Sequence, residues 1–167
     1  LDGGDEGTVA KEIETIDRIC RLSGASEVRL AQTETERNDL WRGRRSVLPS
    51  LARRCPNQLS EDISLPRAAI PEAIRRIKAI GEKYELTIAV FGHAGDGNLH
   101  PFILFDDRNP VDTEKVKKAC EEILDECIKV GGTISGEHGI GLEKKQSMKA
   151  LFTEAELTAM KDIKTVF

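Results

Sequence analysis

The sequence predicts an α+β fold with a largely antiparallel sheet and helices packed on one face. Segments with apolar residues at helical spacing alternate with short apolar runs that are typical of strands. Two such runs, 86–91 and 99–105, flank a glycine-rich stretch whose Asp96-Gly97 pair is a strong hairpin signal. A chain of 167 residues is also long enough to bury a core.

The first half of the chain contains two expected helices. Apolar side chains recur at helical spacing over residues 8–22, and Gly24 supplies a stop. Thr33 and Glu36 have the spacing of a capping box, which opens a second helix to about Leu48. The other segments expected here are a short strand at 28–31 and irregular chain over 49–65, with a strand candidate at 62–65.

The second half supplies the hairpin and three more helices. Pro71 fits the first position of a helix that ends near Gly81. Thr153 and Glu156 repeat the capping-box spacing and open the last helix. The remaining elements are a long helix over 111–130 and a short strand over 133–135. We expect this alternation to give a sheet of the ferredoxin-like kind.

The composition is that of an ordinary globular domain, with 32% charged residues, 39% hydrophobic residues and a net charge of -4. No basic stripe with interleaved aromatic residues occurs, so nucleic acid is not an expected partner. No apolar run approaches the roughly 20 residues that span a bilayer. The four cysteines form no Cys-x-x-Cys pair, which favours reduced core cysteines in a cytosol-like compartment.

All three histidines lie in two short glycine-rich segments. Gly92–His100 contains His93 and His100, and Ser135–Gly141 contains His138. Imidazole is the side chain most often recruited for proton transfer near pH 7 and for binding transition metals. Because every histidine lies beside carboxylates and glycines, the sequence predicts one site.

The expected hairpin gives two of these histidines a geometry. With Asp96-Gly97 as a two-residue tip, His93 pairs directly with His100, which brings two imidazoles to one face. Phe91 then pairs with Phe102 behind them and gives the site an apolar floor.

Pro101 leaves a second arrangement open. Proline cannot donate to a ladder, so the returning strand is expected to be an edge strand or to be bulged there. A bulge would shift the pairing and separate His93 from His100.

Two histidines need a third ligand to hold a catalytic metal, and Glu137 is the candidate. His93, His100 and Glu137 with an open position suit a divalent Lewis acid, zinc or manganese. His138 is expected to point elsewhere and to stay free as a base. Glycines such as Gly139 would let the backbone approach a flat ligand closely.

Two other hypotheses fit the same residues. One is a free-standing metal-binding domain or metal-dependent hydrolase that uses the His₂Glu set with an activated water. The other is a non-catalytic interaction module in which the two histidine segments only pack.

The two histidine segments together resemble the C-terminal domain of FAD-linked oxidases in the vanillyl-alcohol-oxidase superfamily. Members of this type include the FAD-binding subunit of glycolate oxidase and the D-lactate dehydrogenases. The resemblance covers the whole chain, including segments 40–45 and 61–66. It implies that residues 1–167 are the substrate or cap domain of a larger flavoprotein whose N-terminal FAD-binding domain is absent. Such a fragment is expected not to turn over by itself.

The resemblance also implies a role for each site residue. His93, His100 and Glu137 would bind the metal, and His138 would take the proton of the substrate hydroxyl while the C2 hydride moves to FAD. Arg42 matches the arginine that clamps the substrate carboxylate.

Cofactor contacts are implied for Glu137, His138 and Gly139. Related enzymes that oxidise dicarboxylates carry a lysine and an asparagine where this chain has Ser60 and Phe102. The resemblance therefore favours a small monocarboxylic 2-hydroxy acid, glycolate or D-lactate. It also implies other oxidase subunits as partners, including an iron-sulfur subunit, and a cytoplasmic location at the inner face of the membrane.

Overall fold

The computed structural model describes residues 4–93 and 95–167. The chain divides into two compact units, one ending at Val47 and the other running from Leu48 to Phe167. That residues 1–167 act as one substrate or cap domain stays a prediction. Within the described ranges, no helix is both long enough and apolar enough to cross a membrane.

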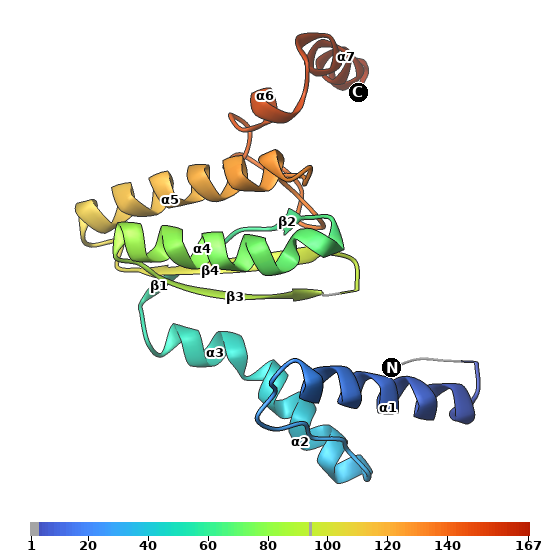
Figure 1. Ribbon diagram of the computed structural model, residues 1–167. Helices are drawn as coiled ribbons and strands as arrows, with labels where there is room; N and C mark the ends of the chain where they lie inside the picture. Colours follow the sequence, from blue (N-terminus) through green and yellow to red (C-terminus); the bar gives the residue numbers. More distant parts are fainter. Residues whose placement is uncertain (1–3, 94) are drawn as a thin grey trace. The chain divides into compact units, whose positions relative to one another are not determined.

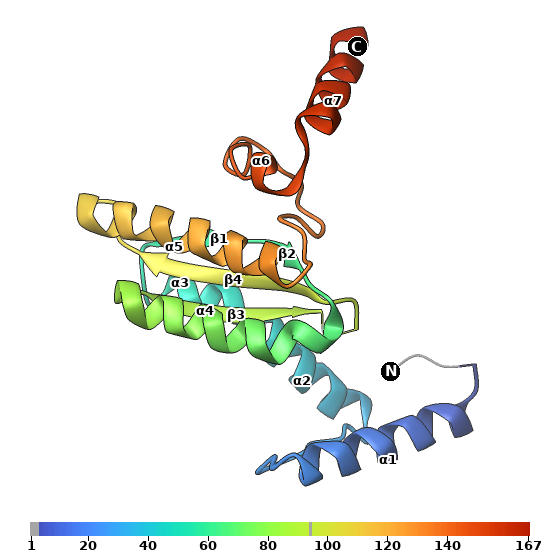
Figure 2. The same ribbon diagram turned by 45° about the horizontal axis from the view of Figure 1, so that its top comes forward.

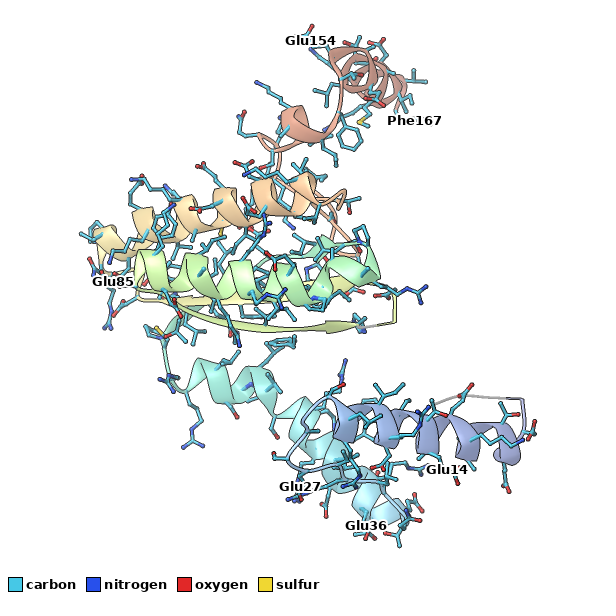
Figure 3. The ribbon with its side chains drawn as sticks, viewed as in Figure 1. Glu14, Glu27, Glu36, Glu85, Glu154 and Phe167 are labelled. Carbon is cyan, nitrogen blue, oxygen red and sulfur yellow. The ribbon has the colours of Figure 1, made fainter. Side chains whose placement is uncertain are left out.

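The first unit consists of helices α1 (Glu6–Leu22) and α2 (Glu34–Arg45). The expected capping box of α2 is present, with Thr33 accepting from the Glu36 amide and Glu36 at the start of the helix (Figure 3). Neither helix fully buries a residue. The strand predicted at 28–31 is wrong, because within the part of the chain that the structure describes no strand pairs with that segment.

The second unit contains the sheet. Its elements, in chain order, are α3 (Val47–Ala52), which begins at the boundary, β1 (Asn57–Ser60), β2 (Ile63–Ser64), a 3₁₀ turn (Arg67–Ala69), α4 (Ile70–Tyr84), β3 (Thr87–His93), β4 (Asn98–Phe105), α5 (Pro110–Lys129), α6 (Met148–Leu151) and α7 (Glu154–Val166).

The sheet is antiparallel and centred on β4. Strand β3 pairs with one edge of β4, while β1 and β2 pair with its other edge. A single bridge between Ser64 and Thr133 extends the sheet beyond β2. If β1 and β2 are counted as one interrupted strand, the spatial order is that of a ferredoxin-like sheet. The α+β prediction is confirmed, whereas the irregular chain expected before residue 62 contains β1.

Helices α4 and α5 lie together on one face of this sheet, as the two views in Figures 1 and 2 show. The main core fills the space between these helices and the sheet, and its most deeply buried residues are Ile63, Ile103, Ala119, Ile123 and Ile134. Side chains alternate along a strand, so neighbouring residues of β4 face the opposite side. The opposite face carries the side chains of His93 and His100.

The four cysteines are free, as the sequence predicts. Cys127 belongs to the core, and burial raises the pKa of its thiol to about 11. A thiol in this state is a packing residue and a poor nucleophile at neutral pH.

Candidate functional site

The hairpin brings His93 and His100 together through a register that differs from the predicted one. Four residues, 94–97, connect β3 to β4, so His93 pairs with Asn98 and Phe91 pairs with His100. The direct pairing of His93 with His100 is therefore wrong. The two histidines are diagonal neighbours on one face instead, and their ring centroids are 5.6 Å apart.

Pro101 sits in the central strand without a bulge, contrary to expectation. Its carbonyl accepts a hydrogen bond of 2.9 Å from the Glu61 amide, so its nitrogen also faces that side. There β1 has already ended and β2 has not begun. The missing N–H of proline therefore falls at the interruption, where the ladder does not need it.

The predicted apolar floor is present next to the histidines, but the direct pairing of Phe91 with Phe102 is wrong, because Phe102 pairs with Ala89. Phe91 and Phe102 stack with ring centroids 4.5 Å apart, and His100 lies next to Phe91. His100 is only 6% exposed. Burial lowers the pKa of His100 below its ordinary value, against the opposing pull of nearby carboxylates. The neutral imidazole that results is the form that ligates a metal.

The second histidine segment is a loop held by the carboxylate of Asp62. Oδ2 of Asp62 accepts from the backbone amides of Gly136, Glu137 and His138 at 2.8 to 2.9 Å, and also from the Ser135 hydroxyl. Successive amides that converge on one oxygen form an anion-binding nest. Burial alone would raise the pKa of the Asp62 carboxyl. The hydrogen bonds from the loop and one from Asn98 outweigh this effect and hold that pKa well below its usual range.

Glycine at position 136 is required by this nest. A Cβ there would collide with Nδ2 of Asn98 and lie 3.0 Å from Oδ1 of Asp62. At Gly136 the backbone thus lies close to the chain's own side chains, whereas the expected close approach to a flat ligand stays a prediction. Gly139 has a positive φ of 84°, which ends the turn.

The buried side chain of Lys144 holds the backbone on both sides of the contact between Asp62 and the loop. Nζ of Lys144 donates to the backbone carbonyls of Asp62 and Ile134 at 2.8 Å, and it pairs with the Glu61 carboxylate at 3.1 Å. Both side chains of the ion pair are nearly fully buried. Buried charges persist when they are paired and hydrogen-bonded in this way.

The carboxylate of Glu137 lies among all three imidazoles. Its Oε1 is 3.2 Å from Nε2 of His100, 3.6 Å from Nε2 of His138 and 3.9 Å from Nε2 of His93. The rings of His138 and His100 stack with centroids 5.1 Å apart. The expectation that His138 points elsewhere is therefore wrong, because it faces the same carboxylate as the other two histidines.

Donor atoms within the described residues fit a divalent metal at His93, His100 and Glu137, whose ligand atoms all lie within 4.8 Å of one another. A second group of Asp62, His100 and His138 meets the same distance. The first group is favoured because the oxygens of Asp62 already accept five hydrogen bonds. Imidazole and carboxylate donors suit zinc or manganese.

The predicted substrate clamp and the predicted cofactor contacts lie in different units of the chain. Arg42 belongs to the first unit, is 76% exposed and pairs with Asp39 at 3.2 Å. Its role as a carboxylate clamp stays a prediction. The backbone amides of Glu137, His138 and Gly139 bond to Asp62 and Ser135. Any contact of these three residues with a cofactor would therefore involve their other atoms, and such contacts stay a prediction.

Sequence reasoning missed the polar residues that hold the loop. Asp62 and Asn98 lie in the motifs noted above, but nothing in their spacing assigns them a role. Lys144 follows a glycine-rich segment with no periodic pattern. One usable signal is the acidic pair Glu61-Asp62 directly before the apolar Ile63, since charges beside a buried strand need partners.

The fold and site together define an α+β domain with a histidine-carboxylate centre on the sheet face opposite α4 and α5. The chain belongs to the family described as FAD linked oxidases, C-terminal domain, whose model matches residues 1–167. FAD is thus the cofactor of its family.

Curated relatives agree with this assignment. The glycolate oxidase subunit GlcD of Escherichia coli (strain K12) is 40% identical over 164 residues, which is 98% of this chain and 33% of that protein. GlcD of Bacillus subtilis (strain 168) is 42% identical over 160 residues, covering 96% and 34%. A D-lactate dehydrogenase of Archaeoglobus fulgidus is 32% identical over 160 residues, covering 93% and 34%. The chain spans about a third of the length of these relatives.

Proposed function

We propose that this chain is the substrate half of an FAD-dependent oxidoreductase that converts a small 2-hydroxy acid, glycolate or D-lactate, into the 2-oxo acid. The proposal is supported by the family and by relatives named as glycolate oxidase subunits and D-lactate dehydrogenases. The observation that carries it is the group of three histidines around the carboxylate of Glu137.

His93, His100 and Glu137 would hold a divalent ion, which supplies Lewis-acid polarisation of the substrate hydroxyl when bound. Bound FAD supplies the acceptor for the hydride from C2 of the substrate. The buried, neutral His100 and the apolar floor formed by Phe91 and Phe102 restrict water on one side of this group.

His138 is the proposed base. Its side chain is 49% exposed, so a substrate hydroxyl could reach the imidazole. The imidazole takes the hydroxyl proton as C2 loses its hydride, which leaves the 2-oxo acid and a protonated His138. Glu137 lies 3.6 Å away and would stabilise that positive charge.

Substrate size is proposed from Ser60 and Phe102. These two residues are direct partners across β1 and β4, and Phe102 is stacked on Phe91. A second carboxylate would meet an apolar ring there in place of a cationic or amide partner. Arg42, from the first unit, is the proposed clamp for the single carboxylate because a guanidinium binds carboxylates through two parallel hydrogen bonds.

We further propose that the intact protein works with other oxidase subunits, including an iron-sulfur subunit, in the cytoplasm at the inner face of the membrane. The support is that the GlcD relatives are named as subunits of a glycolate oxidase.

Anaerobic stopped-flow absorbance of the flavin tests the proposed reaction in the intact protein. Glycolate or D-lactate should bleach the flavin, and D-2-hydroxyglutarate should do so poorly. His138→Ala should slow flavin reduction by about 10²–10⁴-fold, the usual contribution of a positioned base. Leu142→Ala, at a fully exposed neighbouring position, is the matched control.

Two outcomes would contradict the proposal. Flavin reduction at the wild-type rate in His138→Ala refutes the base role. An intact protein that no 2-hydroxy acid reduces refutes the proposed reaction itself.

A further inference from the structure

Asp62 stands out among the residues around the site because it is fully buried and contacts both histidine segments. It lies directly before β2, more than 70 positions before the loop that it holds. Its backbone carbonyl accepts from Lys144, so main chain and side chain are both fixed. Nothing in the proposed reaction uses this carboxylate.

The two oxygens of Asp62 contact different halves of the site. Oδ2 accepts the amides of Glu137 and His138, the two loop residues with proposed chemistry. Oδ1 accepts from Nδ2 of Asn98 at 2.7 Å and lies 3.8 Å from Nδ1 of His100.

His100 supplies the second, independent observation. Its Nδ1 is buried and has no hydrogen-bond partner among the described residues, and Asp62 Oδ1 faces it. Its other nitrogen, Nε2, faces Glu137 at 3.2 Å. A carboxylate next to one ring nitrogen favours the proton on that nitrogen and leaves the other free to ligate a metal.

We propose that Asp62 is the positioning residue of this site. One oxygen templates the loop that presents Glu137 and His138, and the other sets the ring orientation and tautomer of His100. The second part rests on the proposed function, since it concerns the ligand nitrogen of a metal site, whereas the first part does not.

Two substitutions test the two roles. Alanine lacks both oxygens, whereas asparagine replaces Oδ1, which accepts from Asn98 and faces His100, by an amide nitrogen. Asp62→Ala removes the acceptor for the loop amides. Asp62→Asn keeps one acceptor oxygen for the loop but removes the negative charge that faces His100. Asp125→Asn, on the exposed side of α5, is the matched control for the change of a carboxylate to an amide.

Hydrogen exchange followed by mass spectrometry tests the loop template in the intact protein, with a chelator present. In Asp62→Ala, peptides covering 135–141 should exchange at least about tenfold faster, as expected when hydrogen bonds to a charged acceptor are lost. Peptides covering β4 should keep their protection. Unchanged exchange at 135–141 overturns the template.

If Asp62→Ala does not fold, Ser135→Ala gives the same test. This change removes the hydroxyl that links Asp62 to the Gly139 amide. Exchange at 135–141 should become severalfold faster, and wild-type exchange there overturns the template.

Calorimetric titration with Mn²⁺ and Zn²⁺ tests the role toward His100 in the chelator-treated intact protein. Asp62→Asn should weaken the Kd about 10- to 100-fold, the range for carboxylates that support a ligating histidine. Its loop exchange should rise less than that of Asp62→Ala, because the amide oxygen still accepts from the loop. A wild-type Kd in Asp62→Asn overturns this part.

A wild-type protein that binds neither ion removes the metal from the proposed function and with it the role toward His100. The exchange of the 135–141 peptides still decides the loop template in that case. Failure of the proposed function and failure of the template are thus distinguishable.

Discussion

The hairpin with His93 and His100 and the loop with Glu137 and His138 meet at one site but are held by different forces. The hairpin belongs to a continuous ladder, and alternate residues of β4 are buried in the apolar core. The loop, residues 135–138, has no regular secondary structure and is bonded to buried polar side chains. A ladder spreads its stability over many bonds, whereas the loop depends on a few charged groups.

The largest expected effect concerns the lysine behind the loop. Lys144→Met should lower the free energy of unfolding by about 3–5 kcal/mol, because the buried Glu61 carboxylate then lacks its counter-charge. Urea unfolding followed by circular dichroism measures this. Lys145→Met, at the next and exposed position, is the control.

A double variant checks the cause. Adding Glu61→Gln to Lys144→Met removes the unpaired charge and should recover part of the lost stability. Equal stabilities of the Lys144→Met and Lys145→Met proteins would show that the loop does not depend on this ion pair.

An intermediate effect is expected at the glycines of the two segments. Gly136→Ala should cost about 1–3 kcal/mol, because its Cβ collides with Asn98 beside the nest. Gly95→Ala, in the hairpin connection, should change stability by less than about 0.5 kcal/mol, since apart from its chain neighbours no atom of the described residues lies within 4 Å of the added Cβ. Thermal unfolding of both variants provides the comparison, and equal costs would remove the distinction between segments.

The smallest effect is a pH dependence in the hairpin. Burial lowers the pKa of His100, so below about pH 6.5 the unfolded chain binds a proton that the folded chain resists. Above that pH neither state binds the proton, so His100 adds no pH dependence to the free energy of unfolding. Below that pH, the free energy of unfolding falls as the solution is acidified, by at most about 1.4 kcal/mol per pH unit for one proton.

His100→Gln should reduce this slope between about pH 5 and pH 6.5 when unfolding is measured with a chelator present. Identical slopes in the two proteins would show that His100 does not resist protonation in the folded state.

Much of the fold follows from local patterns in the sequence. Thr33 and Glu36 form the expected capping box, and Pro71 lies in the first turn of its helix, one residue after the start at Ile70. The strands of the hairpin were predicted because apolar β-rich runs flank a turn signal. Segment 28–31 has a similar apolar run but no partner strand among the residues described, and β1 lacks a clear alternating pattern, so pairing alone decides both.

For the candidate site, the sequence predicted which residues come together but not how they are arranged. Histidines confined to two segments were enough to predict one site with His93, His100 and Glu137 together. The register was mistaken because Asp96-Gly97 favours a two-residue tip, whereas the Gly97 amide bonds to the His93 carbonyl in a four-residue connection. The direction of His138 also depends on the loop, whose shape no local pattern encodes.

Short-range periodicity and residue chemistry were enough to predict the α+β class, both capping boxes and the grouping of His93, His100 and Glu137. The tertiary structure alone decided the register of the hairpin, the nest around Asp62 and the buried pair of Lys144 with Glu61. Each of these depends on contacts between segments far apart in the chain: Asp62 and His138, for example, are 76 positions apart. Such contacts form only when the whole sheet and its covering helices assemble.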